Sequence, residues 1–330
     1  MPGKFRKMLP NNLSGSDGFG QEPSRAAVGW RLPLACSLVA ASLCLAAPAA
    51  RAQDTAAQEA AHRRALLAEL PPDAAKRVFG LAERPTPGPA RAIGSYTRGC
   101  LAGGVEMPAD GPHWQVMRPS RNRAWGHPVL LAFLQRLAAD ADAAAGWPGL
   151  LIGDMAQPRG GPMLTGHASH QLGIEADIWL TPMPDRQLNT AERDEMPAVN
   201  LVAVGGLDID PQTWRPQDRA LLEAAAKSPG VARIFVNPAI KRALCREAGT
   251  DRAWLRLIRP WWEHRRHFHV RLACPPGERE CRNQAPPPPG DGCGELAWWF
   301  TPQALHPKPS PPRPPLRLSD LPTQCIALAR

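Results

Sequence analysis

Two histidine-rich segments, far apart in the chain, place the strongest constraint on its fold. They contribute five histidines, namely His167 and His170 in GHASHQLGIEAD and His264, His267 and His269 in HRRHFHV. Residues 174–180 (IEADIWL) and 267–272 (HFHVRL) alternate as β-strands do, so Asp177 lies on the polar side of its strand and His267 and His269 share one side of theirs. If the two strands are neighbours, His170, Asp177 and His269 converge on a single ion.

Neutral imidazoles and a carboxylate form a ligand set that zinc accepts. The residues alone leave other interpretations open. A histidine is more often a satisfied surface or core residue than a ligand, and HRRH is also typical of a basic patch that binds phosphate or carboxylate. The helical His-Glu-x-x-His pattern does not occur in the sequence, so a helix-borne zinc site of that type is excluded.

The N-terminal region has the composition of a secretory signal peptide. Basic residues precede the apolar run at 32–47, which is too short and too rich in alanine for a confident membrane span. Ala50-Arg51-Ala52 then matches a small-x-small cleavage site. We therefore predict that residues 1–52 are a signal peptide and that the mature protein is periplasmic, without stable membrane insertion. An uncleaved anchor is the alternative.

Export changes the charge and the cysteine count. The segment 1–52 holds six of the 39 basic residues and two of the 30 acidic ones, so its removal lowers the formal charge from +9 to +5, which suits an anionic cell wall. No basic stripe with interleaved aromatics occurs, so we expect no nucleic acid partner. Six cysteines remain, and an even number in an exported chain predicts three disulfides among fifteen possible connectivities. They are Cys100, Cys245, Cys274, Cys281, Cys293 and Cys325.

The pattern of elements predicts an α+β fold. Apolar periodicity and capping residues indicate helices at 127–146, 217–227 and 238–247, and strands at 149–153, 174–180, 232–236 and 267–272. They do not alternate as repeating strand–helix units, which favours a largely antiparallel sheet. We predict a leader and linker at 53–92, a domain at 93–300, and a Pro-rich tail at 301–330 that Cys325 ties to the core.

Several segments resemble the LAS metallopeptidases and, within them, the penicillin-insensitive murein endopeptidases. The matching stretches include IGSYTRGC, GHASHQLG, RIFVNPAIKRALC, RPWWEHRRHFHVRL and GDGCGELAWWF, and together they extend from Ile93 to Cys325. The resemblance implies a small antiparallel sheet flanked by helices and stapled by disulfides. It implies zinc held by His170, Asp177 and His269, with His167 as a less certain ligand and His267 and His264 in catalytic roles. The implied cysteine pairs are Cys100–Cys325, Cys245–Cys293 and Cys274–Cys281.

The resemblance also implies an activity. Zinc-activated water would hydrolyse D-alanyl–diaminopimelate cross-links in peptidoglycan, and β-lactams would not inhibit because no acyl-serine forms. A D,D-carboxypeptidase or a non-catalytic wall-binding zinc module are the alternatives, and the sequence is compatible with a homo-oligomer. Close relatives in the resembled family carry an Asp and a His between the two clusters that can bind additional metal. Residues 201–210 (LVAVGGLDID) contain no histidine, so we expect no second metal there.

Other polar and aromatic residues flank the two clusters. Glu175 shares the polar face of the Asp177 strand, and we interpret it as a solvated or salt-bridged surface acid. Trp179, Trp261 and Trp262 have two possible roles, which are the floor of a substrate groove or the packing of the core.

Overall fold

The computed structural model describes residues 57–308 and 314–329. The predicted signal peptide, residues 1–52, therefore lies outside the described residues. Within the described ranges, no helix combines the length and the apolar character needed to cross a lipid bilayer.

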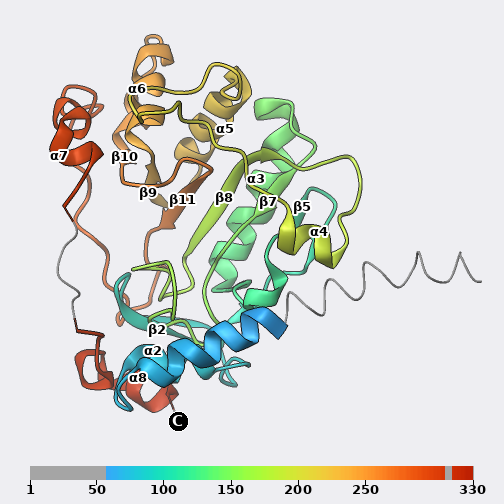
Figure 1. Ribbon diagram of the computed structural model, residues 1–330, viewed down its shortest axis with the longest axis vertical. Helices are drawn as coiled ribbons and strands as arrows, with labels where there is room; N and C mark the ends of the chain where they lie inside the picture. The colour runs from blue at the N-terminus through green and yellow to red at the C-terminus, as the bar shows by residue number, and fades with distance from the viewer. Residues whose placement is uncertain (1–56, 309–313, 330) are drawn as a thin grey trace, which may run out of the picture. The chain divides into compact units, whose positions relative to one another are not determined.

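A seven-stranded sheet, ordered β10-β9-β11-β8-β7-β5-β4, forms the centre of the fold (Figure 1). Its strands are β4 (Asp110–Gly111), β5 (Trp114–Val116), β7 (Leu150–Ile152), β8 (Glu175–Pro182), β9 (Val231–Val236), β10 (Ile258–Pro260) and β11 (His267–Leu272). The β10–β9 and β5–β7 pairs are parallel and the other pairs are antiparallel. Two short ribbons pair β1 (Arg91–Ser95) with β2 (Arg98–Ala102) and β3 (Val105–Glu106) with β6 (Trp125–Gly126). The predicted α+β class with a largely antiparallel sheet is confirmed.

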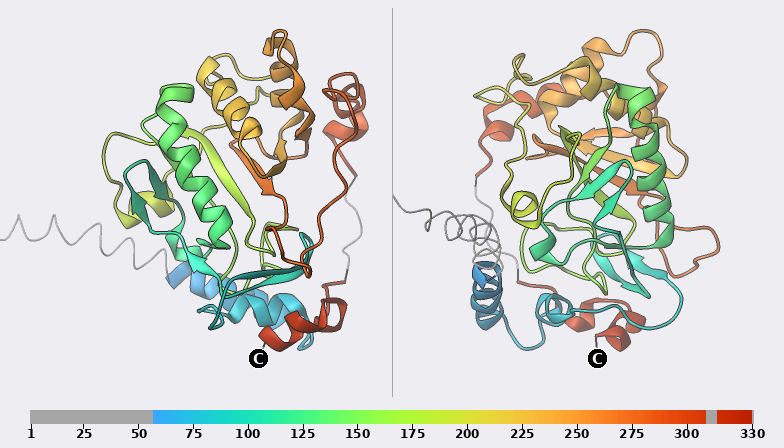
Figure 2. Two further views of the ribbon diagram at one scale, coloured as in Figure 1. Left: turned by 180° about the vertical axis from the view of Figure 1, so that it is seen from behind. Right: turned by 90° about the vertical axis from the view of Figure 1, so that its right-hand side faces the viewer.

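Helices α3 (Pro128–Ala145) and α5 (Pro216–Lys227) cover one face of this sheet (Figure 2). The apolar side chains of β8 and β11, such as Ile178 and Val270, pack against these helices in the main core. The opposite face carries the polar side chains of the two strands. This separation follows from the two-residue period of a strand, and it confirms the alternation predicted for 174–180.

Local signals in the sequence set the ends of α3. The His127 side chain caps the helix by accepting a hydrogen bond from the backbone N–H of Val129, and Pro128 occupies the first turn, where a missing N–H costs nothing. The helix ends at Gly146, whose φ of 64° is a left-handed conformation that glycine adopts without strain. The predicted helix at 127–146 is therefore confirmed. Helix α6 (Pro238–Glu247) likewise begins with Pro238 after an Asn237 cap.

In the part of the chain that the structure describes, three disulfides hold the loops and the C-terminal segment. They are Cys100–Cys325, Cys245–Cys293 and Cys274–Cys281, the pairs that the family resemblance implies. Helices α2 (Ala75–Leu81) and α8 (Thr323–Leu328) pack with β1 and β2 in a small apolar cluster around Cys100 and Cys325. The remaining helical segments are residues 57–69, α4 (Thr190–Glu195), α7 (Pro302–Leu305) and the 3₁₀ turns Pro119–Arg121, Ala253–Arg256, Ala297–Phe300 and Leu318–Asp320.

Candidate metal centre

The register of β8 against β11 places the two histidine segments together. Asp177 lies directly opposite His269, and the neighbouring pairs on the same face are Glu175 with Arg271 and Trp179 with His267. Side chains directly opposite each other in an antiparallel pair have Cβ atoms within about 5.5 Å. Two segments far apart in the sequence therefore contribute to one cluster on the face of the sheet that the helices leave open.

Four histidines surround the carboxylate of Asp177, and three of them, His167, His170 and His269, approach it from the buried side. His170 Nε2 lies 3.4 Å and His269 Nδ1 lies 3.3 Å from Asp177 Oδ1, and His167 Nδ1 lies 3.6 Å from Asp177 Oδ2. Potential ligand atoms of His167, His170 and Asp177 all lie within 4.8 Å of one another. His170 lies in the loop before β8. Its φ of 64° is a left-handed conformation that is uncommon for residues other than glycine. This group could bind a metal ion.

Unpartnered polar atoms show that the residues fit a cation. Both ring nitrogens of His170 and Oδ1 of Asp177 are buried and have no hydrogen-bond partner, and they are three of the five such side-chain atoms in the described ranges. A buried polar atom left without a partner costs about 1–3 kcal/mol. A cation bound between an imidazole nitrogen and a carboxylate oxygen would remove this penalty.

Glu175 orients His269 from beneath the cluster. It is completely buried, and its Oε1 accepts hydrogen bonds from His269 Nε2 at 2.8 Å and from Arg271 Nε at 2.7 Å. Burial alone would raise the pKa of Glu175, but the Arg271 charge and the His269 bond hold it well below its usual range. Because Nε2 donates to Glu175, His269 presents Nδ1 to Asp177. Glu175 was predicted to be a solvated or salt-bridged acid at the surface. It does form a salt bridge, with Arg271, but its side chain is completely buried and not at the surface.

A second buried carboxylate orients His167. Asp154 follows β7, and its Oδ2 lies 2.9 Å from His167 Nε2 and 2.9 Å from Arg123 Nη1. Burial would raise the pKa of Asp154, but the His167 hydrogen bond and the nearby Arg123 and Arg121 hold it well below its usual range. Sequence reasoning missed Asp154. Its only signal was an acid placed directly after a buried strand, and the pairing with His167 is a contact of the loops.

His264 and His267 complete the cluster on its solvent side. His267 Nε2 lies 3.5 Å from Asp177 Oδ2, its side chain is 29% exposed, and burial lowers its pKa. His264 Nδ1 lies 2.7 Å from the Trp262 carbonyl oxygen and must therefore donate to it, which leaves Nε2 as an acceptor. Burial lowers the pKa of His264 to about 4, so the ring is neutral near pH 7.

The backbone that aims His264 is unusual. Glu263 and His264 have φ values of 57° and 41°, in the left-handed region. Asn237, the cap of α6, holds this turn by donating from its side chain to the Glu263 carbonyl and from its backbone to the His264 carbonyl. Strained non-glycine residues of this kind cluster at functional sites. Asn237 was not identified from the sequence, where its only signal is its position directly before Pro238 at the start of a predicted helix.

The nearby tryptophans do not share one role. Trp179 is buried and packs with Met117, Leu151 and Leu188, so it belongs to a core cluster and not to a groove. Trp262 is half-buried, and Trp261 is 49% exposed.

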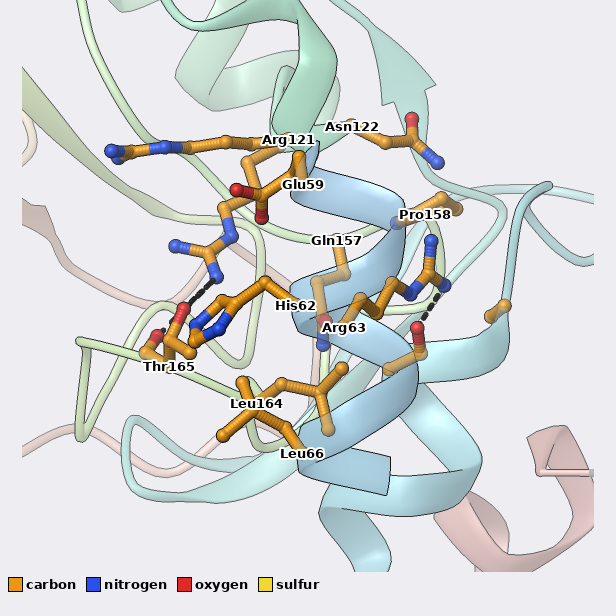
Figure 3. A pocket seen from close by; sticks show the side chains of 13 residues that line it. Glu59, His62, Arg63, Leu66, Arg121, Asn122, Gln157, Pro158, Leu164 and Thr165 are labelled. Carbon is orange, nitrogen blue, oxygen red and sulfur yellow. Dashed lines mark hydrogen bonds between the residues drawn. The ribbon is translucent and has the colours of Figure 1, made fainter. Parts of the chain in front are cut away.

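A separate pocket lies near Arg121 and Arg123, the two arginines that pair with Asp154. It lies between residues 57–69 and the loops that carry Arg121, Asn122 and Thr165 (Figure 3). Arg123 bonds Thr165 in this wall, and Glu59 and His62 face it from the helix. None of the five clustered histidines lines this pocket. The candidate centre therefore rests on its ligand chemistry and not on the depth of a cavity.

Comparison with known proteins identifies the family of the chain. A family profile described as penicillin-insensitive murein endopeptidase matches residues 92–330. The chain belongs to this family. A relative of that name from Klebsiella pneumoniae subsp. pneumoniae is 46% identical over 248 residues, which cover 74% of this chain and 88% of the relative. Relatives of the same name from Escherichia coli O1:K1 and strain SMS-3-5 are 46% identical over 247 residues, with the same coverage. The five histidines and Asp177 all lie inside the matched region.

Proposed function

We propose that this protein is a periplasmic zinc endopeptidase that hydrolyses D-alanyl–diaminopimelate cross-links in peptidoglycan. The observation that carries the proposal is the buried, unpartnered pair of His170 and Asp177 beside His269, in a chain of the murein endopeptidase family. We further propose that residues 1–52 are removed on export and that residues 93–300 form the peptidase domain. Residues 301–330 then form a tail that the Cys100–Cys325 bridge ties to the core.

In this proposal His170, Asp177 and His269 hold zinc, with His167 as a further ligand or close neighbour. Bound zinc would supply a Lewis acid that polarises the scissile carbonyl and makes water a nucleophile near neutral pH. Glu175 and Asp154 keep the rings of His269 and His167 turned toward Asp177 through the hydrogen bonds described above.

His267 is the group we assign to proton transfer. It is the most exposed ring among those that face Asp177, and its lowered pKa leaves it neutral at pH 7, able to accept a proton. The protonated ring can then donate to the leaving amine or stabilise the developing oxyanion. His264, with Nδ1–H held by the Trp262 carbonyl, presents an acceptor at Nε2 that can orient a substrate N–H or a water. Because water is the nucleophile in this proposal, no side chain becomes acylated. β-Lactams, which acylate a nucleophilic serine, should therefore not inhibit the enzyme.

Defined muropeptides test the proposal. Purified protein is incubated with cross-linked dimers, with and without a chelator, and the products are analysed by mass spectrometry. Conversion of dimers to monomers that stops with chelation and returns with zinc supports the proposal. Release of free D-alanine would instead indicate a carboxypeptidase, and zinc binding without any product would indicate a non-catalytic module.

A substitution separates proton transfer from metal binding. His267→Ala should lower turnover at least 100-fold while zinc content stays at the wild-type level, because general acid–base groups contribute about 10²–10⁴-fold. His113→Ala, on the β4–β5 turn at the far edge of the sheet, is the control and should change neither quantity. Wild-type activity in His267→Ala would contradict the assignment.

A further inference from the structure

Four tryptophans form one aromatic surface beside the candidate centre, which we call the tryptophan platform. They are Trp261, Trp262, Trp298 and Trp299. The ring centroids of Trp261 and Trp262 lie 5.4 Å apart, those of Trp262 and Trp299 lie 4.8 Å apart, and those of Trp298 and Trp299 lie 5.1 Å apart. The loop after β10 and the 3₁₀ turn Ala297–Phe300 supply two rings each, so the platform joins segments that are distant in the sequence.

The platform is exposed yet held in place. Trp261 is 49% and Trp298 is 50% exposed, and they are the two aromatic residues among the exposed large hydrophobic residues of the described ranges. Beneath them Trp262 is half-buried and donates its indole N–H to the Ala304 carbonyl at 2.9 Å. Fixed aromatic faces left in water lose little conformational entropy on binding, which is a property of binding surfaces and not of a core.

Ring contacts connect the platform to the candidate centre. Trp261 packs edge-to-face on Phe235, with the two ring centroids 5.9 Å apart. Phe235 packs in the same way on His269, with the ring centroids 5.5 Å apart. Trp261 also lies in the same loop as His264. The platform therefore lies next to the candidate centre, separated from His269 by one ring.

Two ion pairs lie in the segments that supply the platform rings. Glu263 and Arg265 approach each other at 3.8 Å with side chains 78% and 39% exposed, and Glu295 pairs with Arg259 at 2.9 Å. Each of these two pairs carries both signs, so neither presents a single uncompensated charge to the platform. A phosphate backbone or an anionic lipid surface would need an excess of cations. A ligand with an apolar face and neutral hydrogen-bonding groups at its edge suits this surface.

We propose that the tryptophan platform is a subsite for the neutral N-acetylated sugars of the peptidoglycan glycan chain. This rests on the proposed function, because the stem peptides that a murein endopeptidase cuts are attached to such sugars. The C–H face of a pyranose ring packs on an indole face, and its hydroxyl and acetamido groups reach the polar edge. The subsite places the glycan so that its attached peptide enters the histidine cluster.

Substrates with and without sugar test the subsite. Trp298→Ala should raise the KM for disaccharide-bearing cross-linked dimers about tenfold, equal to about 1.4 kcal/mol, with kcat unchanged. The KM for the same dimers freed of sugar by an amidase should not change. Trp298→Phe should retain most of the affinity, and Leu81→Ala, which removes an equally exposed apolar residue from α2, is the control. An equal effect of Trp298→Ala on both substrates would overturn the proposal.

A binding measurement keeps the subsite separate from the enzyme activity. Titration of the wild-type protein with N-acetylglucosamine oligomers should change its tryptophan fluorescence saturably, and Trp298→Ala should weaken this binding at least tenfold. This result would support the subsite even if no cross-link were cleaved. A wild-type dimer in sedimentation that Trp298→Ala converts to a monomer, with no sugar binding, would show that a second copy covers the platform and would refute the proposal.

Discussion

Replacing Glu175 with glutamine tests whether a buried carboxylate both stabilises the fold and orients a metal ligand. The Glu175 carboxylate accepts three hydrogen bonds, from Arg271 Nε and His269 Nε2 at one oxygen and from the backbone N–H of His170 at the other. Glutamine has nearly the same shape but only one acceptor oxygen. Whichever way its amide turns, an NH₂ group faces at least one N–H donor, and Arg271 loses its buried counter-charge.

The expected magnitudes follow from these contacts. Removing one member of a buried ion pair costs about 3–5 kcal/mol. Arg271 keeps its hydrogen bond to Gln284 and its contact with the Tyr96 ring at 4.2 Å, which places the loss near the lower end. Loss of the group that orients a ligating histidine lowers metal affinity about 10–100-fold. Glu175→Gln should therefore lower the free energy of unfolding by about 3 kcal/mol and weaken zinc binding at least tenfold.

Urea unfolding measures the first quantity, and competition with a chelator of known affinity measures the second. Unfolding is followed with and without zinc, so that the metal contribution can be subtracted. Glu192→Gln is the matched control, because Glu192 pairs with Arg186 on the surface at 2.6 Å and its substitution should change neither quantity appreciably. The double variant Glu175→Gln/Arg271→Met should recover stability but not zinc affinity.

Two results would refute this role of Glu175. If Glu175→Gln matched the Glu192→Gln control in both unfolding and zinc affinity, the buried carboxylate would have no orienting role. If the double variant restored zinc affinity together with stability, the effect on zinc would come from general loosening of the fold and not from the hydrogen bond to His269.

Three further predictions concern other parts of the molecule. Asp154→Asn should lower zinc affinity or turnover at least tenfold in the wild type and have no added effect in a His167→Ala background, because Asp154 acts through that ring. Replacing Cys100 and Cys325 with alanine opens a bridge with a sequence separation of 225 and should lower the unfolding free energy in urea by about 2–5 kcal/mol. Burial raises the pKa of Asp218 to about 6, so the folded state binds its proton more tightly than the unfolded chain and loses stability as pH rises from about 4 to 6. Asp218→Asn should therefore be more stable than the wild type at pH 7, by about 3 kcal/mol, and equally stable near pH 4, as urea titrations at both values will show.

The three helices and four strands that the sequence indicated were predictable because their signals are local, whereas the short strands β1 to β6 and β10 carried no comparable signal. The strand β8 matched its two-residue alternation, and α3 began at Pro128 and ended before Gly146 as its capping residues indicated. The disulfide pairing was of a different kind. Six cysteines predict three bridges, but the choice among fifteen pairings came from the family resemblance, and the structure contains those pairs.

Tertiary structure alone decided how the polar groups are partnered. The sequence by itself indicated that His170, Asp177 and His269 could meet if their strands were neighbours, because side-chain direction along a strand is a local property. It could not show that loops bury Glu175 or that Asp154 reaches His167, since burial and pairing depend on segments remote in the chain. Nor could it separate buried Trp179 from exposed Trp261, because the exposure of a tryptophan depends on the remote segments that pack against it.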